Sequence, residues 1–300
     1  MKINKILIMI VIVYSIFLIN AIVTNLHEYN TKLENYNYVI ENCSNKSFCS
    51  NFTTVEQCEA YCNKIEASGS PQRNDFLYTF YDMFYQERTK IIQLLSPILI
   101  GFASVWYFLN DLKSKNIKNK LLRIEYKKYF FKNWKKSVLY AFVVPIFCVL
   151  LFIASYIMCF NVSLNNISES AIFWTGEKDN IFLTILLNII SIGFQSVLWI
   201  NIFYIGAKKS KNIILSLIVS YMIFLGLWIV SELTGLFASI FLGLVKEEVA
   251  LLFSLSSIWS FDGKKCFIIF IYQFILAIIS SIFVNYYYSS KEGVLIDNEI

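Results

Sequence analysis

Six blocks of this sequence contain no Asp, Glu, Lys or Arg, and each is about as long as a membrane-spanning helix. A helix needs about 20 mostly apolar residues to cross about 30 Å of hydrocarbon, whereas the strands of a membrane barrel are shorter and alternate in polarity. Across the chain, 57% of the residues are hydrophobic and 16% are charged, whereas soluble domains carry about 25% charge. The sequence therefore predicts an all-α polytopic membrane protein with six transmembrane helices, at residues 6–24, 91–109, 138–160, 181–207, 213–230 and 266–288.

The loops between these blocks alternate in charge. Residues 110–137 carry ten basic and two acidic residues, and residues 208–212 carry three basic residues and no acidic one. Residues 25–90 carry six basic against nine acidic residues, and residues 161–180 carry one against three. Because basic loops stay in the cytoplasm, both termini are predicted to lie inside (N-in/C-in). The net charge of +5 then indicates contact with anionic lipid, and no nucleic acid is expected as a partner.

Three regions follow from this division. Residues 1–24 are predicted to be an uncleaved transmembrane anchor, because no clear signal-peptidase site follows the first block. Residues 25–90 are predicted to form an extracellular loop domain that contains cysteines. Residues 91–300 are predicted to form the membrane domain, which includes spans two to six. The bias towards Ile, Asn, Lys, Phe and Tyr is typical of a low-GC bacterial genome, so the predicted location is a bacterial plasma membrane, crossed several times.

The extracellular loop domain holds four of the seven cysteines. An even number of cysteines in an exported segment indicates two disulfides, for which three connectivities exist. Free thiols are the main alternative, and a zinc site is disfavoured because the close cysteine pairs of zinc ribbons are missing. The candidates for disulfides are Cys43, Cys49, Cys58 and Cys62. The remaining three, Cys148, Cys159 and Cys266, are expected to pack as small apolar residues.

The segment after the fifth block is too long for one crossing. Residues 213–245 are apolar except for Glu232, and as one helix they would extend about 50 Å. We therefore expect a break at residues 231–235, followed by a re-entrant or interfacial hairpin on the outer side over residues 232–263. An amphipathic segment that lies flat on the membrane is the simpler alternative.

Residues that usually carry chemistry are scarce. The chain has one histidine, His27, and no charged residue within the six blocks, which disfavours proton relays and catalysis inside the membrane. It contains no H-E-x-x-H zinc motif, no P-loop and no G-x-S-x-G elbow. We therefore expect that the chain is not an enzyme and that it has neither catalytic residues nor a metal site.

Uncharged polar residues form stripes on the fourth, fifth and sixth blocks. Small hydrogen-bonding residues in membrane helices usually mark helix packing, and the alternative is a polar lining for a translocation path. We favour packing. The residues in question are Asn188, Ser191, Gln195, Ser216, Ser220, Gln273 and Ser280. Pro97 and Pro145 are expected to kink the second and third spans.

The inner loop at residues 110–137 combines basic and apolar residues. Between Leu121 and Trp134, Arg and Lys residues alternate with Leu, Ile, Tyr and Phe. This pattern predicts a basic helix with a large apolar surface. Such a helix lies on the anionic inner leaflet or docks on a cytoplasmic partner.

Several short motifs in and beside this loop resemble those of a known family. They are Asp111-x-Lys113, Ile117-Lys118-Asn119, Leu121-Leu122-Arg123 and Tyr129, then Lys208-Lys209-x-Lys211-Asn212, and the ending Tyr286-Tyr287-Tyr288-x-x-Lys291-Glu292. Together with six spans, a basic loop between spans two and three and an outer hairpin before span six, they are similar to the permease subunit of a type-2 ATP-binding-cassette (ABC) exporter. The chain departs from the family at Lys115-Asn116, where a Gly-Thr pair is usual, and in having only five residues before span one.

The resemblance implies a function. The chain would form the translocation path of an exporter, as a homodimer or with a related permease. ATP and Mg²⁺ would be bound by separate ABC ATPase subunits, so this chain itself would bind no cofactor. Closure of the ATPases would tilt spans two and five, because the docking helix would be joined directly to span two. The residues implied in ATPase coupling are Asp111, Ile117, Lys118, Asn119, Leu122, Arg123, Lys127, Tyr129 and Lys209.

A function from another class is a non-transporting membrane protein. An immunity or sensor protein of this kind would bind a ligand through the outer loop at residues 25–90 and would need no ATPase.

Overall fold

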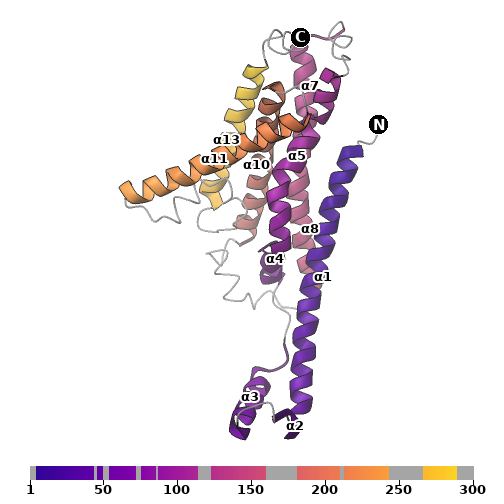
Figure 1. Ribbon diagram of the computed structural model, residues 1–300, viewed down its shortest axis with the longest axis vertical. Coiled ribbons are helices and arrows are strands. Elements are labelled where there is room, and N and C mark those ends of the chain that lie inside the picture. The colour runs from indigo at the N-terminus through magenta and orange to yellow at the C-terminus, as the bar shows by residue number, and fades with distance from the viewer. Residues whose placement is uncertain are drawn as a thin grey trace. The chain divides into compact units, whose positions relative to one another are not determined.

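The computed structural model describes residues 5–43, 46–49, 54–71, 76–85, 87–113, 123–159, 181–209, 213–242 and 266–288, and within these ranges the regular structure is entirely helical. The described part of each apolar block lies mostly in one of six helices (Figure 1). These helices are α1 (Lys5–Asn42), α5 (Glu87–Lys113), α8 (Val143–Met158), α10 (Ile181–Lys209), α11 (Ile213–Leu242) and α13 (Cys266–Tyr287). The other elements are α2 (Lys46–Cys49), α3 (Val55–Ser68), α4 (Phe76–Tyr85), α7 (Tyr126–Val138) and the 3₁₀ helix η1 (Leu139–Phe142).

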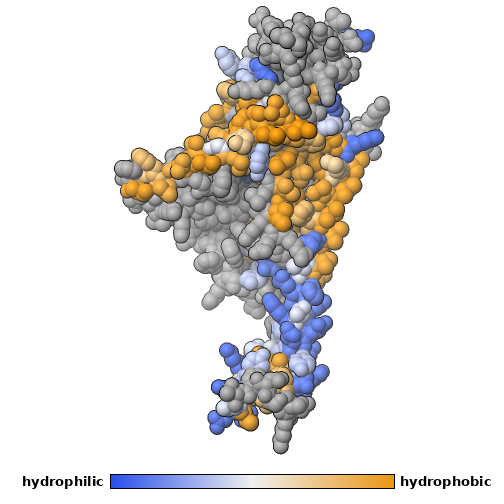
Figure 2. Space-filling view, viewed as in Figure 1, coloured by the Kyte–Doolittle hydropathy of each residue, from blue (hydrophilic) through white to orange (hydrophobic). Residues whose placement is uncertain are grey.

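Four helical stretches in the described part of the chain are long and apolar enough to cross a membrane. They are Lys5–Asn42, Tyr126–Met158, Phe182–Lys208 and Phe270–Tyr287, and Ile214–Leu227 in α11 is a shorter apolar stretch. Many of their apolar side chains are exposed, as expected for surfaces that face lipid. Figure 2 shows the orange apolar surface of α1 giving way to a blue polar one. The chain is thus an all-α multi-pass membrane protein, whereas the count of six crossings and their direction remain predictions.

The chain divides into two compact units. The first contains residues 1–15, 90–150 and 172–300, and the second contains residues 16–89 and 151–171. Each unit has its own buried apolar residues.

Helix α10 is the central helix of the first unit. It runs parallel to α13, because Phe194 packs on Phe270 and Phe274 while Tyr204, further along α10, accepts a hydrogen bond from Tyr288. Helix α11 lies across α10 at a steep angle (Figure 1). At this crossing Gly206 lies against Ser220, and Leu198 and Ile202 pack on Ile223 and Phe224. Consecutive residues of α10 from Leu198 to Tyr204 are all buried, so α10 is covered on several faces there.

The predicted break in the fifth span is wrong. Helix α11 continues through residues 231–235 and ends at Leu242. The stretch contains no proline, and a helix tolerates one glycine at a cost of about 1 kcal/mol. The predicted break assumed that the helix is no longer than the bilayer is thick. Backbone hydrogen bonds set no upper limit on the length of a helix. The rest of the predicted hairpin, residues 243–263, lies outside the described residues.

The basic helix of the inner loop is joined to span three rather than to span two. Helix α7, η1 and α8 form one helical run from Tyr126 to Met158, whereas the loop and the third span were predicted to meet at residue 138. The 3₁₀ segment η1 precedes Pro145, which lies in the first turn of α8. Proline has no N–H to donate back to residue 141, so the tighter helix occurs where the regular hydrogen bond is missing. Pro97 lies inside α5 without ending it.

In the second unit, helix α4 packs its phenylalanines against α8. Phe76 contacts the rings of Phe152 and Tyr156, and Phe80 also contacts Phe152, in edge-to-face arrangements. Such pairs contribute about 0.5–1.5 kcal/mol beyond their buried area. The sequence analysis placed 76–85 in a loop domain, but these apolar residues make α4 part of a buried aromatic cluster.

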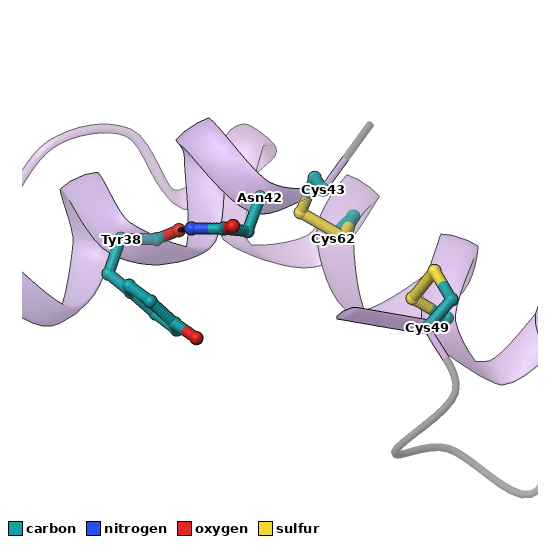
Figure 3. Close-up of a disulfide and its surroundings, with 6 residues drawn as sticks. Tyr38, Asn42, Cys43, Cys49 and Cys62 are labelled. Atoms are coloured by element: carbon teal, nitrogen blue, oxygen red, sulfur yellow. Dashed lines mark hydrogen bonds between the residues drawn. A yellow bond between two sulfur atoms is a disulfide. The ribbon is translucent and has the colours of Figure 1, made fainter. Parts of the chain in front are cut away.

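The four cysteines of the predicted outer domain form two nested disulfides. Cys43 pairs with Cys62, and Cys49 pairs with Cys58, which confirms disulfides and selects one of the three connectivities (Figure 3). Helix α3 begins after Thr54, whose hydroxyl accepts a hydrogen bond from the Gln57 N–H at 3.3 Å. It ends at Gly69, whose φ of 71° suits glycine at a helix end. Cys148 and Cys159 are buried free thiols, as expected, and the side chain of Cys266 lies outside the described residues.

Candidate functional site

Helix α7 has one buried and one basic face. Tyr126, Tyr129, Phe130 and Ser137 are buried, and they recur at the three- and four-residue spacing of one helix face. The opposite face carries exposed basic residues. These are Lys127, Lys128, Lys132, Lys135 and Lys136, with Arg123 exposed in the turn before the helix. The ion pair between Lys128 and Glu125, at 3.1 Å, is solvent-exposed and adds little stability.

The buried face of α7 enters a cluster of four aromatic rings that we call the aromatic joint: Phe108, Phe130, Tyr204 and Tyr288. Phe130 stacks on Tyr288 with ring centroids 4.2 Å apart. Phe108 lies 5.7 Å from Tyr204 and 5.6 Å from Tyr288. The four rings come from α5, α7, α10 and the residue that follows α13, so the joint fastens α7 to the ends of three other helices.

Hydrogen bonds reinforce the aromatic joint. The hydroxyl of Ser137 donates to the Ser104 carbonyl at 2.7 Å and lies 2.7 Å from the Tyr204 hydroxyl. The Tyr288 hydroxyl donates to the Tyr204 carbonyl at 2.6 Å. Buried hydroxyl groups are costly to leave without hydrogen-bond partners. Helix positions that would break these bonds are therefore disfavoured.

A second polar link joins α7 to α10 and α13. The indole N–H of Trp134 donates to the Asn201 side-chain oxygen at 2.9 Å. The Asn201 amide nitrogen donates to the hydroxyls of Ser280 and Ser281 at 2.9 and 3.0 Å. This link therefore joins α7 to α10 and α13 about two helical turns before the ends of those helices.

Lys208 lies at the same end of α10 as the aromatic joint. Its ammonium donates a hydrogen bond to the Tyr287 carbonyl and lies 3.9 Å from the centroid of the Tyr287 ring. A cation near the last carbonyls of a helix is favourable, so Lys208 stabilises the end of α13.

The structure brings together two of the predicted coupling residues. The Tyr129 hydroxyl donates to the Asp111 carboxylate at 2.5 Å, which links α5 to α7. Tyr129 is buried, so it positions α7 instead of facing a partner, whereas Arg123 and Lys127 are exposed. Ile117, Lys118, Asn119 and Leu122 lie outside the described residues, as does the side chain of Lys209.

The polar residues of the spans fall into two groups. Ser191, Ser220 and Ser280 each donate to a carbonyl of their own helix, and Ser280 also accepts a hydrogen bond from the Asn201 amide, which links α13 to α10. In contrast, Asn188, Gln273 and Ser216 are buried but have polar side-chain atoms without a hydrogen-bond partner among the described residues. Gln195 is buried on the same helix as Asn188. Buried polar groups without partners are rare and require an explanation.

The sequence analysis missed Phe108, Ser137, Asn201 and Tyr204. Phe108 and Tyr204 lie in apolar blocks where nothing distinguishes one aromatic residue from another. Asn201 is polar, but it does not share the helix face of Asn188 and Gln195, so the stripe did not include it. The available signal was a lone amide within an apolar span, which usually has a specific partner.

Comparison of the chain with protein-family models, characterised proteins and solved structures finds no significant match.

Proposed function

We propose that this chain is the membrane-spanning permease subunit of an ATP-driven exporter of the ABC class, with six spans and both termini in the cytoplasm of a bacterial cell. The observation that carries the proposal is the construction of α7. Its exposed face is basic, and its buried face is fastened to the ends of α5, α10 and α13 by the aromatic joint. Such a helix can bind a separate ATPase and transmit the movement of that ATPase to several spans.

The route of coupling differs from the one expected from the resemblance. Helix α7 is continuous with η1 and α8, and Trp134 links it to Asn201 of α10. ATPase closure would therefore act first on span three, and through Asn201 on spans four and six. Two permease chains, identical or related, would enclose the path.

Asn188, Gln273 and Ser216 have buried polar atoms without a hydrogen-bond partner among the described residues, which supports a path through the membrane. Water or cargo in such a path would supply the missing hydrogen bonds, whereas helix packing leaves them unmade. The exported cargo would therefore pass polar groups near α10, α11 and α13.

The test reverses charge on the exposed face of α7. The full chain, solubilised in detergent, is mixed with the P-loop ATPases of its source organism, beginning with any that is encoded beside it. We expect Arg123→Glu/Lys127→Glu to weaken capture of the ATPase by at least about tenfold, because like charges replace complementary ones. Lys64→Glu, an exposed change on α3, serves as the control and leaves capture unchanged. The proposal fails if the unaltered chain captures no ATPase or if the double variant binds it equally well.

A second function is favoured by the two disulfides, which fasten α3 to the end of α1 and to α2. An immunity or sensor protein would use this rigid outer segment to bind a ligand and would remain active in the double variant of α7. Activity in that variant, with no ATPase present, would support this second function.

A further inference from the structure

The second unit contains a polar cavity of about 170 Å³. Four parts of the chain line it: α1, Pro71 after α3, α4, and the end of α8. The residues that the argument uses are Asn25, Glu28, Tyr29, Lys32, Tyr78 and Asp82. Most of these residues belong to the segment predicted to lie outside the cell, so the cavity is expected to be accessible from the outside.

Asp82 is held in place and keeps one carboxylate oxygen available. The Asn25 amide donates to the Asp82 Oδ2 at 2.8 Å. Within the described part of the chain, this is the only hydrogen bond of the Asp82 carboxylate. An amide positions the carboxylate without neutralising its charge, so Asp82 can still pair with a cation.

The lining carries more negative than positive charge. Glu28 and Asp82 contribute two carboxylates, and Lys32 contributes one ammonium. Neither Glu28 nor Lys32 forms an ion pair with another described residue. The cavity therefore has a net preference for a cationic ligand.

Aromatic residues add a second attraction for cations. Tyr29 and Tyr78 line the same cavity, and the Tyr29 hydroxyl bonds to the Pro71 carbonyl at 3.5 Å. Ammonium groups are attracted to the faces of aromatic rings, by about 0.5–2 kcal/mol. Carboxylates and phenol rings together are suited to an organic ammonium ion.

The residues that line the cavity disfavour a metal ion, and the volume of the cavity disfavours a large ligand. Among the described residues, no three His, Cys, Asp or Glu side chains lie close enough to hold a metal ion. The volume is also smaller than the roughly 300–1,000 Å³ of sites for drug-sized ligands.

We propose that this cavity binds a small organic molecule that carries a positively charged amino group, through Asp82 and Glu28. The proposal goes beyond ATPase coupling and does not depend on it, since no residue of the cavity belongs to the aromatic joint.

The probe is n-butylammonium chloride, titrated into the purified full-length chain in detergent at neutral pH and followed by calorimetry. We expect binding with a Kd of about 1 mM, as suits a ligand of five heavy atoms. Asp82→Asn keeps the size of the side chain and should weaken binding at least about tenfold, because it removes the charge. Glu28→Gln, at an exposed position, should also weaken binding and covers the case in which Asp82→Asn fails to fold.

Glu34→Gln is the matched control, because Glu34 is exposed on α1 but does not line the cavity. It should bind butylammonium as the unaltered chain does, and sodium butyrate should not bind. A second readout is the reaction of Cys159 with a maleimide in a Cys148→Ala/Cys266→Ala background, because Cys159 lines the cavity. Butylammonium should slow that reaction. The proposal is overturned if butylammonium gives the same heats as sodium chloride, or if both carboxylate variants bind it as tightly as Glu34→Gln does.

Discussion

At the scale of single residues, Asn201 shows how one amide can hold three helices. Its side chain is fully buried, its oxygen accepts from Trp134, and its nitrogen donates to Ser280 and Ser281. All of these partners lie in α7 or α13, whereas Asn201 lies in α10. Apolar surface gives no preference between two helices in lipid, so directional bonds of this kind determine which helices associate.

The first prediction concerns this amide. Asn201→Leu leaves the Trp134 N–H without its acceptor, while Ser280 and Ser281 keep their bonds to the Ala277 carbonyl. We expect the free energy of unfolding to fall by about 1–2 kcal/mol, a usual range for polar links between membrane helices. Thermal or detergent-induced unfolding of the purified chain measures it.

Asn285→Leu is the control for that prediction. Among the described residues, the Asn285 amide donates only to the Ser281 carbonyl of its own helix, so its loss should change stability by less than the loss of Asn201. Equal losses in the two variants would show that Asn201 does not link the helices.

At the scale of helices, α10 and α11 approach closely at Gly206. A Cβ atom on Gly206 would overlap the Ser220 hydroxyl and would lie 3.1 Å from the Ser216 carbonyl oxygen. The Ser220 hydroxyl already donates to that same carbonyl at 2.7 Å. The glycine therefore permits backbone contact that a larger residue would prevent.

The second prediction uses two glycines. Gly206→Ala should lower the free energy of unfolding by about 1–3 kcal/mol, because overpacking forces the helices apart. Gly226→Ala should be neutral or stabilising by up to about 1 kcal/mol, because a Cβ there meets open space and alanine favours the helix. The free energy of unfolding of both variants is measured in the same detergent. A Gly206→Ala protein as stable as the unaltered chain would contradict the close contact of α10 and α11.

The same scale shows what hydropathy can and cannot predict. The charge-free blocks predicted every long apolar helix, because charged residues are expensive in lipid. They did not predict that α1 continues to Asn42 or that α11 continues to Leu242. Hydropathy locates the apolar part of a helix, whereas backbone hydrogen bonds can extend the helix beyond that part. Likewise, the motif residues Asp111 and Tyr129 do meet, but the rings of the aromatic joint come from four distant segments whose contact depends on tertiary packing.

At the scale of the whole molecule, the direction of the helices bears on the number of crossings. Helix α10 is parallel to α13, as two crossings separated by a third would be, whereas α11 lies across α10 at a steep angle (Figure 1). Lys208 and the basic face of α7 lie at the ends joined by the aromatic joint. Six spans with both termini inside stay a prediction.

The third prediction tests that topology. Single cysteines are introduced by Ser114→Cys and by Ser170→Cys into a Cys148→Ala/Cys159→Ala/Cys266→Ser background, which removes the thiols that are not in disulfides. An impermeant maleimide added to intact cells should label residue 170 and should label residue 114 only after lysis. Labelling of both positions in intact cells would contradict the N-in/C-in arrangement.

Helix α1 continues without a break beyond the apolar part that ends at Thr24. From there to Cys43 it rises about 28 Å at 1.5 Å per residue, whereas the lipid headgroups extend only about 5–8 Å beyond the hydrocarbon. The disulfide-bonded hairpin at its end is thus carried on a stiff stalk, clear of the lipid surface. On the predicted topology, which places this segment outside the cell, a macromolecule as large as an antibody or a protein on a neighbouring cell would reach the hairpin without touching the membrane.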